Sequence, residues 1–130
     1  MRLSLGYPSR QAEQQLLQQR SRQSLLKELQ AVLTVDEIIA LKAQVEQVYL
    51  SQAIIDYLLD LAQETRKNRH GLSTRGLLAL KKAAQAYALI EGRDFVSIDD
   101  VQAVFVAVAA HRLALSDEQT LQLMQQVQVS

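Results

Sequence analysis

An arginine at the start of a predicted helix is the strongest chemical signal in this sequence. Ser73 is a suitable N-cap, and Arg75 then falls in the first turn of the helix that follows. Unpaired backbone N–H groups make this end of a helix partially positive, so an arginine there is unfavourable by roughly 0.3–1 kcal/mol. The same N–H groups, together with a guanidinium that donates two parallel hydrogen bonds, suit a phosphate group. The spacing therefore indicates an anion site, with phosphate as the favoured ligand.

Two simpler explanations of Arg75 remain open at this stage. The sequence holds no acidic residue between Thr65 and Ile90 to offset its charge locally. Its side chain could instead point into water, or pair with one of three more distant carboxylates: Glu91, Asp94 and Asp99. The other basic residues around the same loop are explained by their position at the carboxyl end of the preceding helix, where cations are favoured: Arg66, Lys67 and Arg69.

Few other residues have the types and spacing that chemistry requires. The sequence has no cysteine, and its two histidines, His70 and His111, are too isolated to predict a metal site. Two pairs of neighbouring carboxylates, in 36–37 and 99–100, lie where helix caps are expected. No phosphate-binding loop of the form Gly-x-x-x-x-Gly-Lys-Ser/Thr is present in the sequence. An independent enzyme is therefore the least supported class.

The composition predicts a small all-α domain. The 130 residues are 48% hydrophobic, enough for one packed core, and contain only four glycines and one proline. The formal net charge of zero counts against a general nucleic-acid binder. The sequence offers no apolar run of about 20 residues for a membrane span, and its first residues do not resemble a signal peptide. The lack of cysteine fits a cytoplasmic location, which we expect.

Capping residues and apolar spacing divide the chain into about five to six helices, which we expect to form a bundle. The predicted helices cover 9–22, 35–47, 52–67, 74–91, 98–113 and 117–127. Residues 3–5 are predicted as the end of a strand, and 23–33 as either a short helix or a linker. The helix at 74–91 is apolar nearly all round, so it should be central. The helix at 35–47 should pack through one face: Ile38, Leu41, Val45 and Val48. The last helix should dock through another set: Leu121, Met124 and Val127.

The motifs now described resemble the lid of MoxR-type AAA+ ATPases. Residues 71–113 follow the lid pattern of that family in order and spacing: Gly-x-Ser-x-Arg, an alanine-rich helix, Gly-Arg-Asp-aromatic-Val, Ser-x-Asp-Asp-Val and His-Arg-Leu. The segments 6–9, 32–48 and 64–66 match upstream parts of the same pattern. The resemblance covers about residues 3–116, and its strength comes from several short motifs that occur together.

The resemblance implies a division of the chain and a role for Arg75. Residues 1–8 would be the end of a core strand and the hinge, which includes Gly6 and Pro8, and 9–130 would be the helical lid. Arg75 takes the place of the sensor 2 arginine, which reaches the γ-phosphate of ATP, with Ser73 beside it. Tyr7 would lie near the adenine or would simply pack. The resemblance assigns no derivable role to a further group: Arg66, Arg93, His111 and Arg112. We interpret Arg93 as a cation at a helix end.

The resemblance also implies what the lid works with. ATP and Mg²⁺ would be bound mainly by an AAA+ core that precedes Met1, so the chain alone should be inactive although the parent protein is an ATPase. The chain would then be an excised domain or part of a broken gene. Neighbouring subunits of a hexameric ring and a client protein of unknown identity would be the other partners, and hydrolysis would drive chaperone-like assembly or activation of that client.

Two other functions compete with a nucleotide-responsive lid. The basic stretch 66–82 could serve a helical nucleic-acid-binding module, although the neutral net charge and the few aromatic residues make nucleic acid an unlikely partner. The glutamine-rich first helix could instead belong to a protein-interaction module that binds another helix.

Overall fold

Six helices make up the described part of the chain, which confirms the predicted all-α class. The structure is a computed structural model that describes residues 1–18, 29–67 and 70–127. The helices are α1 (Arg10–Gln18), α3 (Val35–Gln47), α4 (Gln52–Arg66), α5 (Thr74–Ile90), α6 (Ile98–Leu113) and α7 (Asp117–Gln125). The bounds of α3 and α6 agree with those predicted, and α4, α5 and α7 end one or two residues early.

Local capping chemistry explains these boundaries. Thr34 and Glu37 form a reciprocal capping box at the start of α3, in which each side chain accepts a hydrogen bond from the other residue's backbone N–H. Ser97 and Asp100 form the equivalent box at the start of α6. α6 ends at Leu113, because the C-cap that follows it, Ala114, has a left-handed φ of 55° that stops the helix. The helix ends are therefore encoded by residues within one turn of them.

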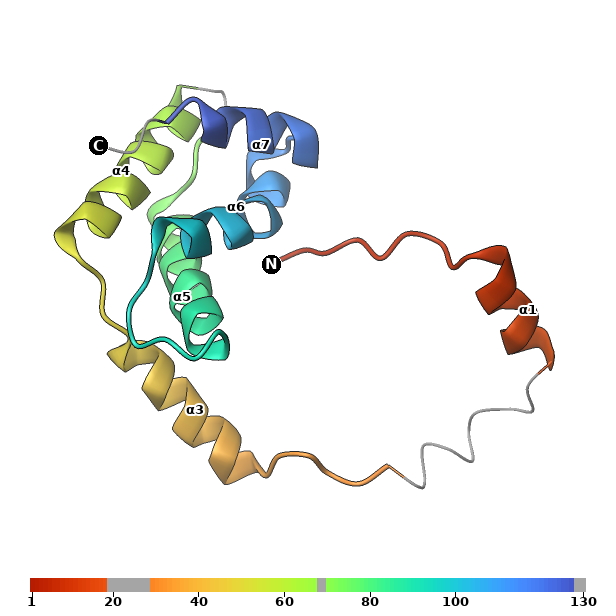
Figure 1. Ribbon diagram of the computed structural model, residues 1–130. Coiled ribbons are helices and arrows are strands. Elements are labelled where there is room, and N and C mark those ends of the chain that lie inside the picture. Colours follow the sequence, from red (N-terminus) through yellow and green to blue (C-terminus); the bar gives the residue numbers. More distant parts are fainter. Residues whose placement is uncertain (19–28, 68–69, 128–130) are drawn as a thin grey trace.

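α5 and α6 pack side by side and form the centre of the bundle (Figure 1). α4 and α7 contact α6, while α3 and α4 contact α5. Phe105 of α6, Leu61 of α4 and Leu80 of α5 are completely buried where these helices meet. α5 is central as predicted, but it is not covered on every side, because Leu78 and Ile90 remain 60% and 80% exposed.

Two extended links between helices pair with each other, one between α3 and α4 and the other between α5 and α6. Tyr49, between α3 and α4, forms an isolated parallel bridge with Phe95, between α5 and α6. The bridge consists of hydrogen bonds from Tyr49 N to Asp94 O (2.8 Å) and from Val96 N to Tyr49 O (2.9 Å). The buried Gln85 side chain donates to Val48 O (2.8 Å) and so ties α5 to the same link. The pairing of these two links was not predicted from the sequence.

Arg93 pairs with Asp100 across the turn between α5 and α6. The guanidinium donates two hydrogen bonds to the carboxylate, of 2.6 and 2.5 Å, while the Ser97 N–H donates a third, of 2.7 Å. The Asp100 side chain is 1% exposed and the Arg93 side chain 30%. Our interpretation of Arg93 as a cation at a helix end was therefore incomplete, because its partner is the carboxylate that also caps α6.

This ion pair predicts an acid-dependent loss of stability. The hydrogen bonds from Arg93 lower the pKa of Asp100 from its ordinary value of 3.8 to about 2. The unfolded chain therefore takes up a proton at a higher pH than the folded chain does, so the stabilisation is complete above the unfolded pKa and is lost as the pH falls through about 2. Urea unfolding of the wild type should lose about 2 kcal/mol through this carboxyl between roughly pH 5 and pH 2. The Asp100→Asn variant should lack this contribution, and equal pH slopes for the two proteins would contradict the assignment.

Some predicted packing is wrong. On α3, Ile38 and Leu41 are 40% and 39% exposed, and only the end of the predicted face, at Val48, is buried. On α7, Leu121 is 41% exposed, whereas Met124 is buried as predicted and Val127 is partly buried. An apolar stripe shows that a helix needs a partner, but its partner can lie outside the chain.

The segment before α1 does not form the predicted strand at 3–5, because a strand requires a neighbour for its backbone groups. Its one backbone contact with the bundle among the described residues joins Arg2 N to Ala107 O of α6 (2.7 Å). α1 follows at the far end of this extended segment (Figure 1), and none of its residues is buried. The rest of the predicted first helix, 19–22, and most of the ambiguous segment 23–33 lie outside the described residues, while 29–33 is not helical.

Candidate functional site

Arg75 lies in the first turn of α5, as predicted, and its side chain is exposed. Ser73 is the N-cap, and its Oγ accepts a hydrogen bond from Gly76 N (3.2 Å). Within the described residues no hydrogen bond or ion pair engages the Arg75 guanidinium. Unpaired cationic donors at a helix N-terminus are suited to a phosphate group.

The carboxylates considered as partners of Arg75 lie at the other end of α5. Glu91 is the C-cap of this helix, and the helix has 17 residues, which corresponds to roughly 25 Å at about 1.5 Å per residue. Asp94 and Asp99 follow still later in the chain. Glu64, near the end of α4, pairs with Lys67 (2.5 Å). The structure therefore does not support a local ion pair as the explanation of Arg75.

The end of α4 holds the loop that leads to Arg75. Leu72, the residue before the N-cap of α5, donates its backbone N–H to Thr65 Oγ1 (3.0 Å) and accepts a hydrogen bond from Arg66 Nε at its carbonyl (3.1 Å). Thr65 and Leu72 are 0% and 1% exposed. Sequence reasoning found Arg66 but explained it only by its place at a helix end. It missed Thr65 as a contact residue, because a lone threonine carries no signal of its partner.

The end of α6 packs against the first turn of α5. A Cβ placed on Gly76 would come within 2.6 Å of Leu72 Cδ1 and 3.3 Å of Arg112 Cδ, so glycine permits this approach. Arg112 Nη1 lies 2.5 Å from the Val108 carbonyl and 2.8 Å from His111 Nε2. Partial burial and then the positive charge of Arg112 lower the pKa of His111. A neutral imidazole can accept the hydrogen bond from Arg112, and both residues remain exposed at this end of α6.

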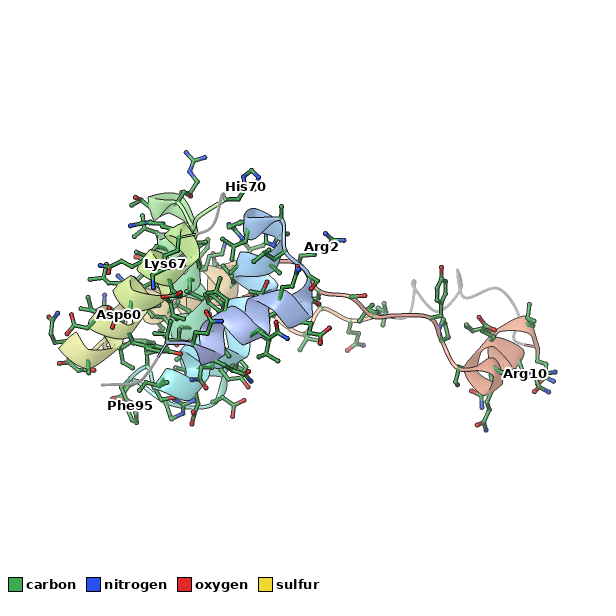
Figure 2. All side chains as sticks on the ribbon, turned by 90° about the horizontal axis from the view of Figure 1, so that it is seen from above. Arg2, Arg10, Asp60, Lys67, His70 and Phe95 are labelled. Atoms are coloured by element: carbon green, nitrogen blue, oxygen red, sulfur yellow. The ribbon has the colours of Figure 1, made fainter. Side chains whose placement is uncertain are left out.

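The predicted hinge residues lie away from Arg75. Gly6 has a φ of +66°, which glycine adopts without strain, and Tyr7 is 98% exposed. Figure 2 shows Arg10 at the far end of the extended segment and His70, from the loop before α5, on the bundle. The described contacts do not bring Tyr7 or Pro8 to Arg75. The start of this segment does meet α6, in a pocket lined by Arg2, Ser4, His111 and Asp117, among others.

The basic stretch 66–82 is partly neutralised. Lys82 pairs with Glu46 of α3 (3.1 Å), Lys67 pairs with Glu64, and Arg66 contacts a carbonyl oxygen. Arg69 lies outside the described residues. These contacts leave less uncompensated charge than the sequence suggests, which weakens the alternative of a nucleic-acid-binding module.

Two other kinds of site find no support where the chain is described. In 1–18, 29–67 and 70–127 no three acidic or histidine side chains are grouped as metal ligands. None of the helices defined above is both long and apolar enough to cross a membrane.

Comparisons with known proteins identify the family of the chain. Residues 63–128, just over half of the chain, match the family described as AAA lid domain. The Bacillus subtilis protein YeaC, which is uncharacterised, is 35% identical over 120 residues, a match that covers 90% of this chain and 38% of that protein. The chaperone MoxR1 of Mycobacterium tuberculosis is 26% identical over 127 residues, covering 88% of this chain and 33% of that protein.

A solved structure supports the fold. The crystal structure of a candidate ATPase from Cytophaga hutchinsonii superposes with a TM-score of 0.77 at 18% identity, covering 97% of this chain and 45% of that one. The chain therefore belongs to the AAA lid domain family, and its resemblance to the lids of MoxR proteins is confirmed. It spans between a third and two fifths of the length of the two relatives named above.

Proposed function

We propose that this chain is the moving lid of a MoxR-type ATPase, and that Arg75 contacts the terminal phosphate of ATP held by an AAA+ core. The observation that carries the proposal is the exposed guanidinium in the first turn of α5, with no partner among the described side chains. The nearby capping hydroxyl of Ser73 already accepts the Gly76 N–H, so Ser73 orders the helix start while Arg75 supplies the charge.

The residues present fit one part of a bound nucleotide. A guanidinium beside a helix N-terminus suits a polyphosphate, whereas the described residues include no carboxylate cluster for Mg²⁺. The magnesium ion and most of the nucleotide would therefore be held by the core. The adenine contact proposed for Tyr7 would require the segment 6–9 to change its position, because Tyr7 is fully exposed here.

Loss of the terminal phosphate would remove a charge-assisted hydrogen bond from the lid. The lid could then rotate about Gly6 to Ser9, where the chain is extended and Gly6 has positive φ. Within a hexameric ring in the cytoplasm, this rotation would reach neighbouring subunits and a client protein. The Mycobacterium relative is named a chaperone, which supports the proposal that lid rotation leads to assembly or activation of a client protein.

The test is an NMR titration that measures phosphate binding by this chain alone. Titration with inorganic tripolyphosphate or MgATP should shift the Arg75 Nε–Hε signal and the backbone amides of 73–76. The Arg75→Ala variant should bind about tenfold more weakly, because about 1.4 kcal/mol is lost with the charge-assisted contact. Lys81→Ala removes an exposed charge from the same helix and serves as the control. An equal loss in both variants would mean that only general charge attracts the phosphate, and the proposal would fail.

A further inference from the structure

The loop before α5 is fixed at one residue by two side chains of α4. We propose that Thr65 and Arg66 are positioning residues for Arg75: they attach the start of α5 to the end of α4, so that the guanidinium is presented in one place. The part of this inference that concerns phosphate rests on the function proposed above. The part that concerns the order of the helix start stands on its own.

Thr65 satisfies a backbone group that would otherwise be buried without a partner. Its Oγ1 donates to Ala62 O (2.7 Å) and accepts from Leu72 N (3.0 Å), so the hydroxyl has one role in its own helix and one in the loop. Both residues are almost completely inaccessible to water. Without the hydroxyl, the Leu72 N–H would lose its partner in a place where water cannot replace it.

Arg66 holds the other side of the same peptide segment. Its Nε donates to Leu72 O (3.1 Å), and its aliphatic part covers Gly71, because a Cβ there would lie 2.6 Å from both Arg66 Cα and Cγ. Arg66 therefore contacts the loop through a fixed planar group and through its backbone. The residue thus has a structural role beyond that of a cation at a helix end.

Leu72 transmits this restraint to the first turn of α5. Its side chain packs on Gly76, the neighbour of Arg75, and its backbone leads directly into the N-cap Ser73. Ser73 in turn accepts hydrogen bonds from Gly76 N at Oγ (3.2 Å) and from Leu77 N at its carbonyl (2.9 Å). A bidentate contact with phosphate needs a defined angle, so the orientation of this turn affects how well Arg75 binds.

The decisive variant is Thr65→Val, which keeps the shape and charge of residue 65 but removes the hydroxyl. Amide hydrogen exchange at Leu72 and Gly76 should become about tenfold faster, and the affinity of Arg75 for tripolyphosphate should fall about threefold. Thr65→Ser, which keeps the hydroxyl, should restore both quantities. Thr120→Val is the matched control, because Thr120 is also completely buried and its hydroxyl bonds to the carbonyl of Ser116 (2.8 Å), the N-cap of α7, and not to a backbone group of this loop.

A double-mutant cycle separates positioning from general destabilisation. If Thr65 acts through Arg75, Thr65→Val should cause no further loss of tripolyphosphate affinity in an Arg75→Ala background. Additive losses, or an unchanged Arg75 response despite faster exchange at Leu72, would overturn the proposal. If tripolyphosphate shifts no signal in the wild type, the proposed function fails. The positioning role is then decided by Gly76 exchange and by the relaxation of the Arg75 Nε–Hε signal, which must both change in Thr65→Val and recover in Thr65→Ser.

Discussion

Replacing Asp100 by asparagine should lower the free energy of unfolding by about 2–3 kcal/mol. The carboxylate accepts hydrogen bonds from Arg93 and from both the N–H and the hydroxyl of Ser97. Asparagine keeps the shape but removes the charge, so the partly buried guanidinium of Arg93 loses its counter-ion. The new amide group also turns a donor towards groups that are themselves donors. Urea unfolding near pH 7, followed by circular dichroism, measures the loss.

Asp99→Asn is the matched control for that variant. Asp99 is the neighbouring residue in the first turn of α6 and is exposed, so its carboxylate interacts mainly with the helix dipole. Its replacement should cost only about 0.3–1 kcal/mol. If the two variants were equally stable, the ion pair would contribute nothing beyond the dipole, and the pH dependence predicted for Asp100 would also be absent.

The helix boundaries could be predicted because each depends on residues close in sequence. Thr34 with Glu37 and Ser97 with Asp100 are spaced for reciprocal capping, and both boxes form. The central place of α5 also followed from local information, since a helix that is apolar nearly all round packs against several neighbours, although Leu78 and Ile90 remain exposed. These features need no knowledge of the rest of the chain.

Contacts across turns and loops could not be predicted in the same way. The pairing of Arg93 with Asp100 depends on how tightly the turn after α5 is formed, and the hydrogen bond from Leu72 to Thr65 depends on the path of a loop. For α3, the apolar spacing was read correctly, but the face from Ile38 to Leu41 has no complete cover in the described chain. The apolar spacing of α3 therefore shows that this face needs a packing partner, but it does not show which residues that partner contributes.

The sequence predicted the position of one residue of the candidate site, Arg75, but not the residues that support it. The unfavourable position of the Arg75 charge could be recognised in the sequence, because the N-terminus of every helix is partially positive. The structure places this residue in the first turn of α5. The supporting contacts from Thr65 and Arg66 were not visible, because each uses a backbone atom of Leu72 as its partner. Backbone groups are the same for every residue, so a sequence cannot indicate which of them a side chain will contact.

The close approach of Gly71 to α4 leads to a second large effect. A Cβ at this position would lie 2.6 Å from Arg66 Cα, and a backbone atom within a helix cannot move aside as a flexible side chain can. Gly71→Ala should therefore displace the loop, break the hydrogen bonds at Leu72 and lower the free energy of unfolding by about 2 kcal/mol. Thermal unfolding would measure this loss, and amide exchange at Leu72 would show whether the loop has moved.

Gly76→Ala provides the comparison that identifies the cause. Its nearest obstacle is Leu72 Cδ1, the end of a flexible side chain, at 2.6 Å. Alanine also has a higher helix propensity than glycine, and the gain is roughly 1 kcal/mol at most, because Gly76 lies in the first turn of α5 and not in its interior. Gly76→Ala should therefore change stability much less than Gly71→Ala does. If it proved the more destabilising of the two, side-chain packing between Leu72 and Arg112 would define this end of the lid, and the backbone contact between the loop and α4 would be secondary.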